Sequence, residues 1–195
     1  MWVEWEFILI NSEATFEILQ EEGFSKATTK KIAAKAGVNE VTIFRKFENK
    51  KNLVEITKEY YFNIFIQKLE DIFDFDEDDG IDEYLQSNFI GILNLSDIDF
   101  SIIKIAMEEV RDVPKREQLI SRISTAAFDK LEEFFQFQID GGRIRSIDAR
   151  VLAVMCYSMT FQSVILYRVY GEDANVEKDS YAKNFLDILY NGIKI

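Results

Sequence analysis

The chain has 195 residues, of which 48% are hydrophobic and 30% charged, and this length and composition are those of a folded protein with a sizeable core. Its formal net charge is −12. It has no histidine and one cysteine, which excludes Ser-His catalytic triads, internal disulfides and cysteine-cluster metal sites. Because a Gly-rich phosphate loop and paired metal-ligand spacing are also absent from the sequence, we expect no enzyme and no bound cofactor.

The fold predicted from the composition is all-α, because one Pro and eight Gly leave few places where a helix must stop. The stretch 1–10 is apolar but short and contains Glu4 and Glu6, so it is predicted to be neither a signal peptide nor a membrane span. No other run approaches the roughly 18 apolar residues that a spanning helix needs. We therefore expect a cytoplasmic protein of about nine helices.

The first helix is predicted over residues 7–22, where Ile10, Ala14 and Ile18 recur at the spacing of an amphipathic helix. Gly23 is a suitable C-cap for this helix, because glycine adopts the left-handed conformation without a steric penalty.

Two short helices follow, joined by a tight turn at Gly37. Thr28 or Thr29 is a suitable N-cap for the first of them, and Asn39 for the second, which covers residues 40–47. In the second helix two apolar side chains four residues apart point together into a core. The opposite face of the helix, which includes residues of its first turn, is then left outside the core. This pattern is typical of a helix-turn-helix.

The helix-turn-helix segment is a basic island on an acidic chain. Between Lys26 and Lys51 there are eight Lys or Arg against two acids, a balance of +6, so the rest of a chain with a total of −12 carries −18. Such an island favours binding of a polyanion, and the second helix of a helix-turn-helix enters the DNA major groove by its N-terminal residues. The predicted base contacts are Asn39, Glu40, Val41 and Thr42, and the predicted backbone contacts are Thr28, Lys30, Phe44, Arg45, Lys46 and Lys50.

The same segment resembles the DNA-binding signature of TetR-type (tetracycline-repressor-like) transcriptional regulators, over about 30 residues and without a gap. The residues that carry the resemblance are Gly23-Phe24, Thr28, Ile32-Ala33, Ala36-Gly37-Val38, Thr42-Ile43-Phe44, Phe47 and Lys50 to Leu53. The resemblance implies a homodimer that binds a near-palindromic operator and has an inducer pocket in its helical body. We therefore predict a three-helix DNA-binding domain at 1–51, a ligand-binding and dimerisation domain at 52–195, and a repressor that an inducer releases.

Three features depart from the family pattern. Phe44 stands where Tyr is commoner, which removes a hydroxyl that can bond a phosphate, and Asn11-Ser12 occupy positions that are usually apolar. Acids replace the basic arm that many members carry before the first helix, so no minor-groove contact is expected there. Together with the net charge, the missing hydroxyl and the missing arm leave open an alternative function, a dimeric module that binds a small molecule or a protein and binds DNA weakly.

Further helices are predicted over 53–73, 81–95, 100–110, 114–139, 149–170 and 180–190, with Pro114 in the first turn of the fourth. The stretch 74–83 holds seven acids in ten residues but lacks the alternating ligands of a calcium loop, so we expect a solvated loop.

The segment 149–170 is apolar on nearly every side, so one face can serve the core while the other needs a partner. In the family the two final helices form the dimer interface, and the pattern fits that arrangement; a wholly internal helix in a monomer is the alternative. The predicted interface residues are Val151, Met155, Phe161, Ile165, Tyr181, Phe185, Ile188 and Leu189.

Aromatic and Met side chains of the body are candidates for an inducer pocket, since ligand sites are mostly apolar, although such side chains also form ordinary core. The candidates are Phe89, Phe100, Met107, Phe134, Phe137, Met155 and Met159. The acidity of the body argues against an anionic inducer, so we expect an apolar or cationic small molecule.

Overall fold

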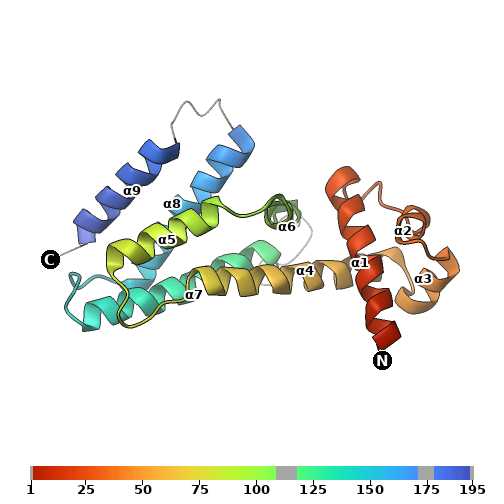
Figure 1. The fold of residues 1–195 in the computed structure, drawn as a ribbon, viewed down its shortest axis with the longest axis horizontal. Helices are drawn as coiled ribbons and strands as arrows, with labels where there is room; N and C mark the ends of the chain where they lie inside the picture. Colours follow the sequence, from red (N-terminus) through yellow and green to blue (C-terminus); the bar gives the residue numbers. More distant parts are fainter. Residues whose placement is uncertain (1, 109–117, 171–177, 194–195) are drawn as a thin grey trace. The chain divides into compact units, whose positions relative to one another are not determined.

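The computed structural model describes residues 2–108, 118–170 and 178–193, and every long regular element within these ranges is a helix (Figure 1). The all-α fold predicted from the sequence is confirmed. The chain divides into two compact units, Met1–Phe65 and Ile66–Ile195.

Three helices and the start of a fourth form the first unit. They are α1 (Trp2–Glu22), α2 (Thr29–Ala36), α3 (Glu40–Phe47) and α4 (Lys50–Ile72), and α4 continues into the second unit. α1 begins at Trp2 rather than at the predicted residue 7, because no Gly or Pro precedes Gly23 to interrupt it. Gly23 has a φ of +76° and follows the last residue of α1, as predicted.

Aromatic pairs connect α1 to the other helices of the first unit. The ring centroids of Phe7 in α1 and Phe47 in α3 are 6.1 Å apart, and those of Phe16 in α1 and Tyr61 in α4 are 3.9 Å apart. Phe47 and Phe16 are almost fully buried. Each buried aromatic side chain of this size contributes about 2 kcal/mol of hydrophobic stabilisation.

Polar side chains occupy part of the buried face of α1. Asn11, Ser12 and Thr15 are fully buried, whereas Ile10, which the spacing predicts on this face, is 40% exposed. The Asn11 side-chain nitrogen donates to the Phe7 carbonyl at 2.6 Å, and the Thr15 hydroxyl donates to the Asn11 carbonyl at 2.6 Å. The prediction for Ile10 is wrong because polar residues stand where the buried face passes, so the apolar pattern alone locates that face incorrectly.

The second unit contains the rest of α4 followed by α5 (Ile81–Leu93), α6 (Asp97–Glu108), α7 (Leu119–Asp140), α8 (Ala149–Ile165), the π-helix η2 (Leu166–Tyr170) and α9 (Lys178–Ile193). α6 begins three residues before the predicted residue 100. The predicted helix 114–139 corresponds to α7, and Pro114 lies outside the described residues. Asp148 caps α8, since its carboxylate accepts from the Val151 backbone nitrogen at 2.9 Å.

Aromatic side chains of α5, α7 and α9 build the core of the second unit. Tyr84 of α5 stacks on Phe134 of α7 with ring centroids 3.6 Å apart, and the Tyr84 hydroxyl donates to the Phe73 carbonyl at 2.8 Å. Burial raises the pKa of Tyr84, so its hydroxyl stays protonated and continues to donate. The ring of Phe89 in α5 lies 5.0 Å from that of Phe185 in α9, and α7 also packs along α8.

The N-terminus of α6 is fixed by a reciprocal cap and by two cations. The Asp99 carboxylate accepts from the Ser96 backbone nitrogen at 2.8 Å, and the Asp99 nitrogen donates back to the Ser96 hydroxyl at 3.2 Å. Lys68 of α4 forms an ion pair with the same carboxylate, and Arg168 of η2 donates to Asp97 at 2.6 Å. Burial alone would raise the pKa of Asp99, but the hydrogen bonds from Lys68 and Ser96 hold it below its ordinary value.

One described stretch, Ala149–Arg168 of α8 and η2, is long and apolar enough to cross a membrane by length and composition, which corrects the expectation that no run approaches that size. In its most apolar window 44% is buried inside the chain. α8 packs against α5 and α7, and a helix covered in this way has the same composition as a membrane span.

Candidate nucleic-acid interface

The turn between α2 and α3 has the geometry that its local sequence predicts. Thr28 caps α2, because its hydroxyl oxygen accepts from the Lys31 backbone nitrogen at 3.2 Å. Gly37 ends α2 with a φ of +69°, a conformation that strains any residue with a Cβ atom. Asn39 caps α3, because its side-chain oxygen accepts from the Val41 backbone nitrogen at 2.8 Å. The predicted caps and turn are confirmed.

α3 has one buried face and one exposed face. Ile43 is fully buried and Phe47 almost so, whereas Val41 is 71% exposed and Phe44 is 47% exposed. The buried face anchors the helix in the first unit, so a partner can contact the opposite face without disturbing the core. The predicted base-contact residues stand together at the start of α3: Asn39 and Val41 are exposed, and Glu40 and Thr42 are half-buried.

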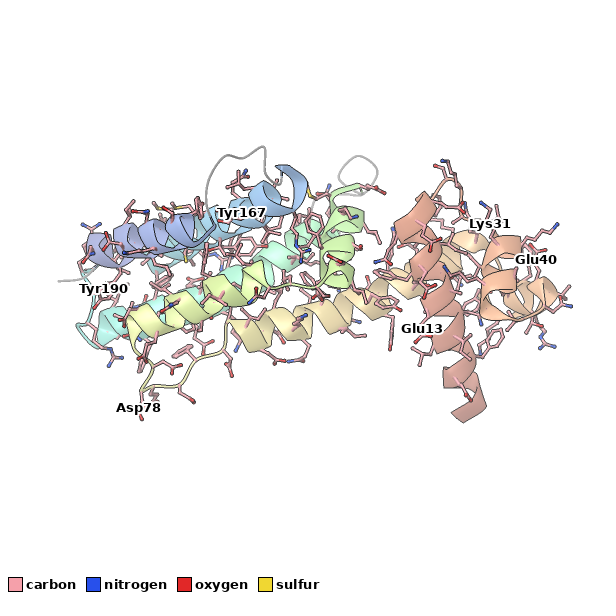
Figure 2. The ribbon with its side chains drawn as sticks, turned by 45° about the horizontal axis from the view of Figure 1, so that its top comes forward. Glu13, Lys31, Glu40, Asp78, Tyr167 and Tyr190 are labelled. Atoms are coloured by element: carbon pink, nitrogen blue, oxygen red, sulfur yellow. The ribbon has the colours of Figure 1, made fainter. Side chains whose placement is uncertain are left out.

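A side-chain hydrogen bond ties the start of α2 to the start of α3. The Thr29 hydroxyl donates to the Glu40 Oε1 atom at 2.7 Å, and Figure 2 shows where Glu40 lies on the first unit. One carboxylate oxygen of a predicted base-contact residue therefore already has a partner, and the second oxygen is still an acceptor. Thr29 and Glu40 are eleven positions apart along the chain, on either side of the turn, so no helical spacing indicates this bond.

Lys50 has a role within the protein that the sequence does not indicate. Its ammonium donates to the Phe24 carbonyl at 3.2 Å and to the Ala27 carbonyl at 3.1 Å, and it lies 4.2 Å from the centroid of the Phe24 ring. Lys50 thus links the start of α4 to the connector before α2, residues 23–28. The remaining predicted backbone contacts are all exposed: Thr28, Lys30, Phe44, Arg45 and Lys46.

Two lysines of the basic island are neutralised by acids of α1. Lys31 forms an ion pair with Glu22, and the Lys35 ammonium lies 2.7 Å from Glu17 and 3.2 Å from Glu21. The hydrogen bond that Lys35 donates to Glu17 raises the pKa of Lys35 above its ordinary value. The charge that the first unit can offer to a polyanion is therefore smaller than the sequence count of +6.

The seven candidate pocket residues are not gathered at one enclosed place. Phe89 and Phe134 take part in the core contacts of the second unit and are almost fully buried. Phe100 and Phe137 are half-buried, and the exposed fractions of Met107, Met155 and Met159 are 47%, 53% and 43%. Side chains as exposed as these three Met do not enclose a ligand within a single chain, so the location of a pocket stays a prediction.

The predicted dimer residues divide into three groups. Val151 and Met155 of α8 and Ile188 of α9 are exposed by 50%, 53% and 68%. Phe185 is buried against Phe89 of the same chain, because it lies on the face of α9 that turns toward α5, and its place in an interface stays a prediction. The others are half-buried, namely Phe161, Ile165, Tyr181 and Leu189.

Comparisons with known proteins agree with this local geometry. Residues 12–56, which contain α2, the turn and α3, match the model of a family described as bacterial regulatory proteins, tetR family. The uncharacterized HTH-type transcriptional regulator YvkB of Bacillus subtilis (strain 168) is 51% identical over 43 residues, which are 22% of this chain and 23% of that protein. The chain thus matches less than a quarter of the length of this curated relative.

Solved structures resemble the chain over most of its length. A protein with unknown function from Rhodococcus sp. RHA1 has a TM-score of 0.75 at 14% identity and covers 97% of this chain and 96% of its own. SmeT, the repressor of the Stenotrophomonas maltophilia multidrug efflux pump SmeDEF, has a TM-score of 0.67 at 17% identity and covers 96% of this chain and 90% of its own. At these identities the likeness shows the fold, and the match of residues 12–56 shows the kinship of the first unit. Residues 12–56 are thus similar to the tetR family of bacterial regulatory proteins, and the chain as a whole shares the fold of these solved structures.

Proposed function

We propose that the protein is a transcriptional regulator that binds a near-palindromic DNA operator as a homodimer, with α3 in the major groove. The observation that supports this most directly is the exposed start of α3, where Val41 is 71% exposed while Ile43 behind it is fully buried. Amide and hydroxyl groups bond base edges, a carboxylate accepts from cytosine, and Val contacts the thymine methyl group. Thr28, Lys30, Arg45 and Lys46, together with Lys50, set the register of the helix by binding phosphates.

The two C-terminal helices supply the dimer surface in this proposal. α8 exposes Val151 and Met155, and α9 exposes Ile188, the most exposed large apolar side chain of the second unit among the described residues. Large apolar side chains left in water on neighbouring segments mark sites of protein association. A two-fold dimer that binds DNA holds its recognition helices about 34–36 Å apart, one turn of the duplex.

The regulatory mode that we propose is repression relieved by a small-molecule inducer. SmeT, whose fold this chain shares, is a repressor. Residues outside Lys26–Lys51 carry a net charge of −18, which favours an apolar or cationic inducer over an anionic one. α4 belongs to both units, and its first residue, Lys50, holds the connector before α2, so a displacement of α4 acts directly on the helix-turn-helix.

In this proposal residues 1–51 bind DNA, residues 52–195 bind the inducer and dimerise, and the protein acts in the cytoplasm. A second candidate function is a dimeric module that binds a small molecule or a protein and touches DNA weakly. Two observations favour it: Lys31 and Lys35 are already paired with acids of α1, and Phe44 offers no hydroxyl to a phosphate.

The test is a selection from a pool of randomised DNA duplexes with the full-length protein, followed by anisotropy measurements on the enriched duplex and on a scrambled one. We expect a two-fold symmetric motif, bound at least about 1,000-fold more tightly than the scrambled duplex, with an affinity that falls linearly in log salt. Val41→Glu should weaken both complexes about 100-fold, because it brings a like charge to the DNA. Thr125→Glu, at an exposed position of α7, is the matched control and should change neither. Equal affinity for both duplexes would refute the regulator and favour the module.

A further inference from the structure

The two adjacent threonines at the start of α2 have different partners. Thr28 accepts from the backbone of its own helix, as an N-cap does. Thr29 instead donates its hydroxyl across the turn to the Glu40 Oε1 atom at 2.7 Å, in a partly buried position. Glu40 is the first residue of α3, the place from which a recognition helix reaches base edges. The bond therefore connects a residue outside the recognition helix to a side chain at the tip of that helix.

This hydrogen bond restricts the orientation of the Glu40 carboxylate. A free glutamate side chain samples many rotamers, and ordering it when DNA binds costs conformational entropy. Because Thr29 already holds Oε1, part of the conformational entropy of Glu40 is lost on folding rather than on binding DNA. The second oxygen is therefore held in a narrow range of positions. An ionised carboxylate has acceptors and no donor, so the oxygen that remains selects for a donor on the base edge.

In the major groove the cytosine amino group is the donor that suits a lone carboxylate oxygen. Guanine presents two acceptors and thymine presents one, and each of them repels a carboxylate; the adenine amino group stands beside the acceptor N7. Building on the proposed function, we propose that Thr29 is a positioning residue for base recognition, which through its hydrogen bond holds Glu40 to accept from a cytosine amino group in each operator half-site. Thr29 determines specificity in this arrangement without touching the base.

A purely structural role for the same bond has a different signature. If the bond served only to set the angle between α2 and α3, losing it would weaken binding to every sequence and lower the melting temperature. It would leave the order of base preferences unchanged. The base-preference profile is thus the measurement that separates the two roles, because a uniform loss of affinity does not alter it.

The experiment repeats the selection from randomised duplexes with wild type, Thr29→Val, Thr29→Ser and Glu40→Gln, each as the full-length protein. Thr29→Val keeps the shape of the side chain and removes the hydroxyl, whereas Thr29→Ser keeps the donor. We expect one cytosine preference per half-site in the wild type, a loss of about tenfold in discrimination at that position alone in Thr29→Val, and recovery in Thr29→Ser. Glu40→Gln should change the preferred base from cytosine to adenine, because an amide pairs with both the N6 and N7 atoms of adenine.

Each outcome bears on a separate claim. If the wild type selects a symmetric motif and Thr29→Val selects the same base at every position, the positioning role is refuted and the proposed regulator stands. A uniform fall in affinity in Thr29→Val, with the profile unchanged and a lower melting temperature, overturns it in favour of the structural role. A wild-type protein that enriches no motif refutes the regulator, and the positioning role with it.

Discussion

The buried hydroxyl of Ser12 gives a stability prediction that follows directly from the packing of α1. The side chain is fully buried, and its hydroxyl oxygen has no hydrogen-bond partner in the described part of the chain. A buried hydroxyl without a partner costs roughly 1–3 kcal/mol, whereas the space left by one oxygen atom loses only a few dispersion contacts. We therefore expect Ser12→Ala to raise the free energy of unfolding of the first unit by about 1 kcal/mol.

Both tryptophans of the chain, Trp2 and Trp5, lie in α1, so intrinsic fluorescence during urea unfolding reports on the first unit. With a urea dependence of about 2 kcal/mol per molar, the expected gain moves the midpoint upward by about 0.5 M at an unchanged slope. Ser25→Ala, at an exposed position, is the control and should leave the midpoint where it is. A midpoint that falls in Ser12→Ala would refute the reasoning, because it would show that the hydroxyl is hydrogen-bonded, for instance to an ordered water.

Three further predictions concern charge and hydroxyl groups. Phe44→Tyr adds a hydroxyl at an exposed position and should tighten operator binding about fivefold in anisotropy measurements, with no change in melting temperature. Glu17→Gln combined with Glu21→Gln releases Lys35 and should steepen the salt dependence of DNA binding by about 1 per first unit; an unchanged slope would mean that Lys35 does not face DNA. The pKa of Asp99 is depressed in the folded protein, so its stabilising contribution is present above the unfolded pKa of about 3.9 and is lost as pH falls through the lower folded pKa. Asp99→Asn should thus be less stable by about 1 kcal/mol at pH 7, with the difference shrinking below about pH 4 in thermal melts.

The helix-turn-helix could be predicted closely because its geometry depends on neighbouring residues. The caps at Thr28 and Asn39 are hydrogen bonds to nitrogens two or three residues away, and the turn at Gly37 depends on the backbone freedom of one residue. Interactions of such short range are determined by the residues next to them in the sequence. The cap at Asp148 is of the same kind, because its carboxylate accepts from a backbone nitrogen three residues along the chain.

Features that depend on contacts between distant residues could not be predicted in the same way. The buried face of α1 includes Asn11 and Ser12. Because these residues are polar, the spacing of apolar residues does not locate that face. On α9 the apolar residues Phe185 and Ile188 look alike in sequence, yet one packs on α5 and the other is 68% exposed. Which of the two faces the core depends on where α5 lies, and spacing along α9 carries no information about that.

The paired lysines also set a limit on how steeply DNA binding can depend on salt. The basic island has eight cations, and two of them, Lys31 and Lys35, are held by carboxylates of α1. The other six are the most that one basic island can place on phosphates, so the slope of log affinity against log salt that the island contributes should not exceed about 5 in magnitude. A steeper slope would mean that DNA displaces the carboxylates of α1. A slope near zero would mean that the exposed cations do not reach phosphates, as the weak-binding module requires.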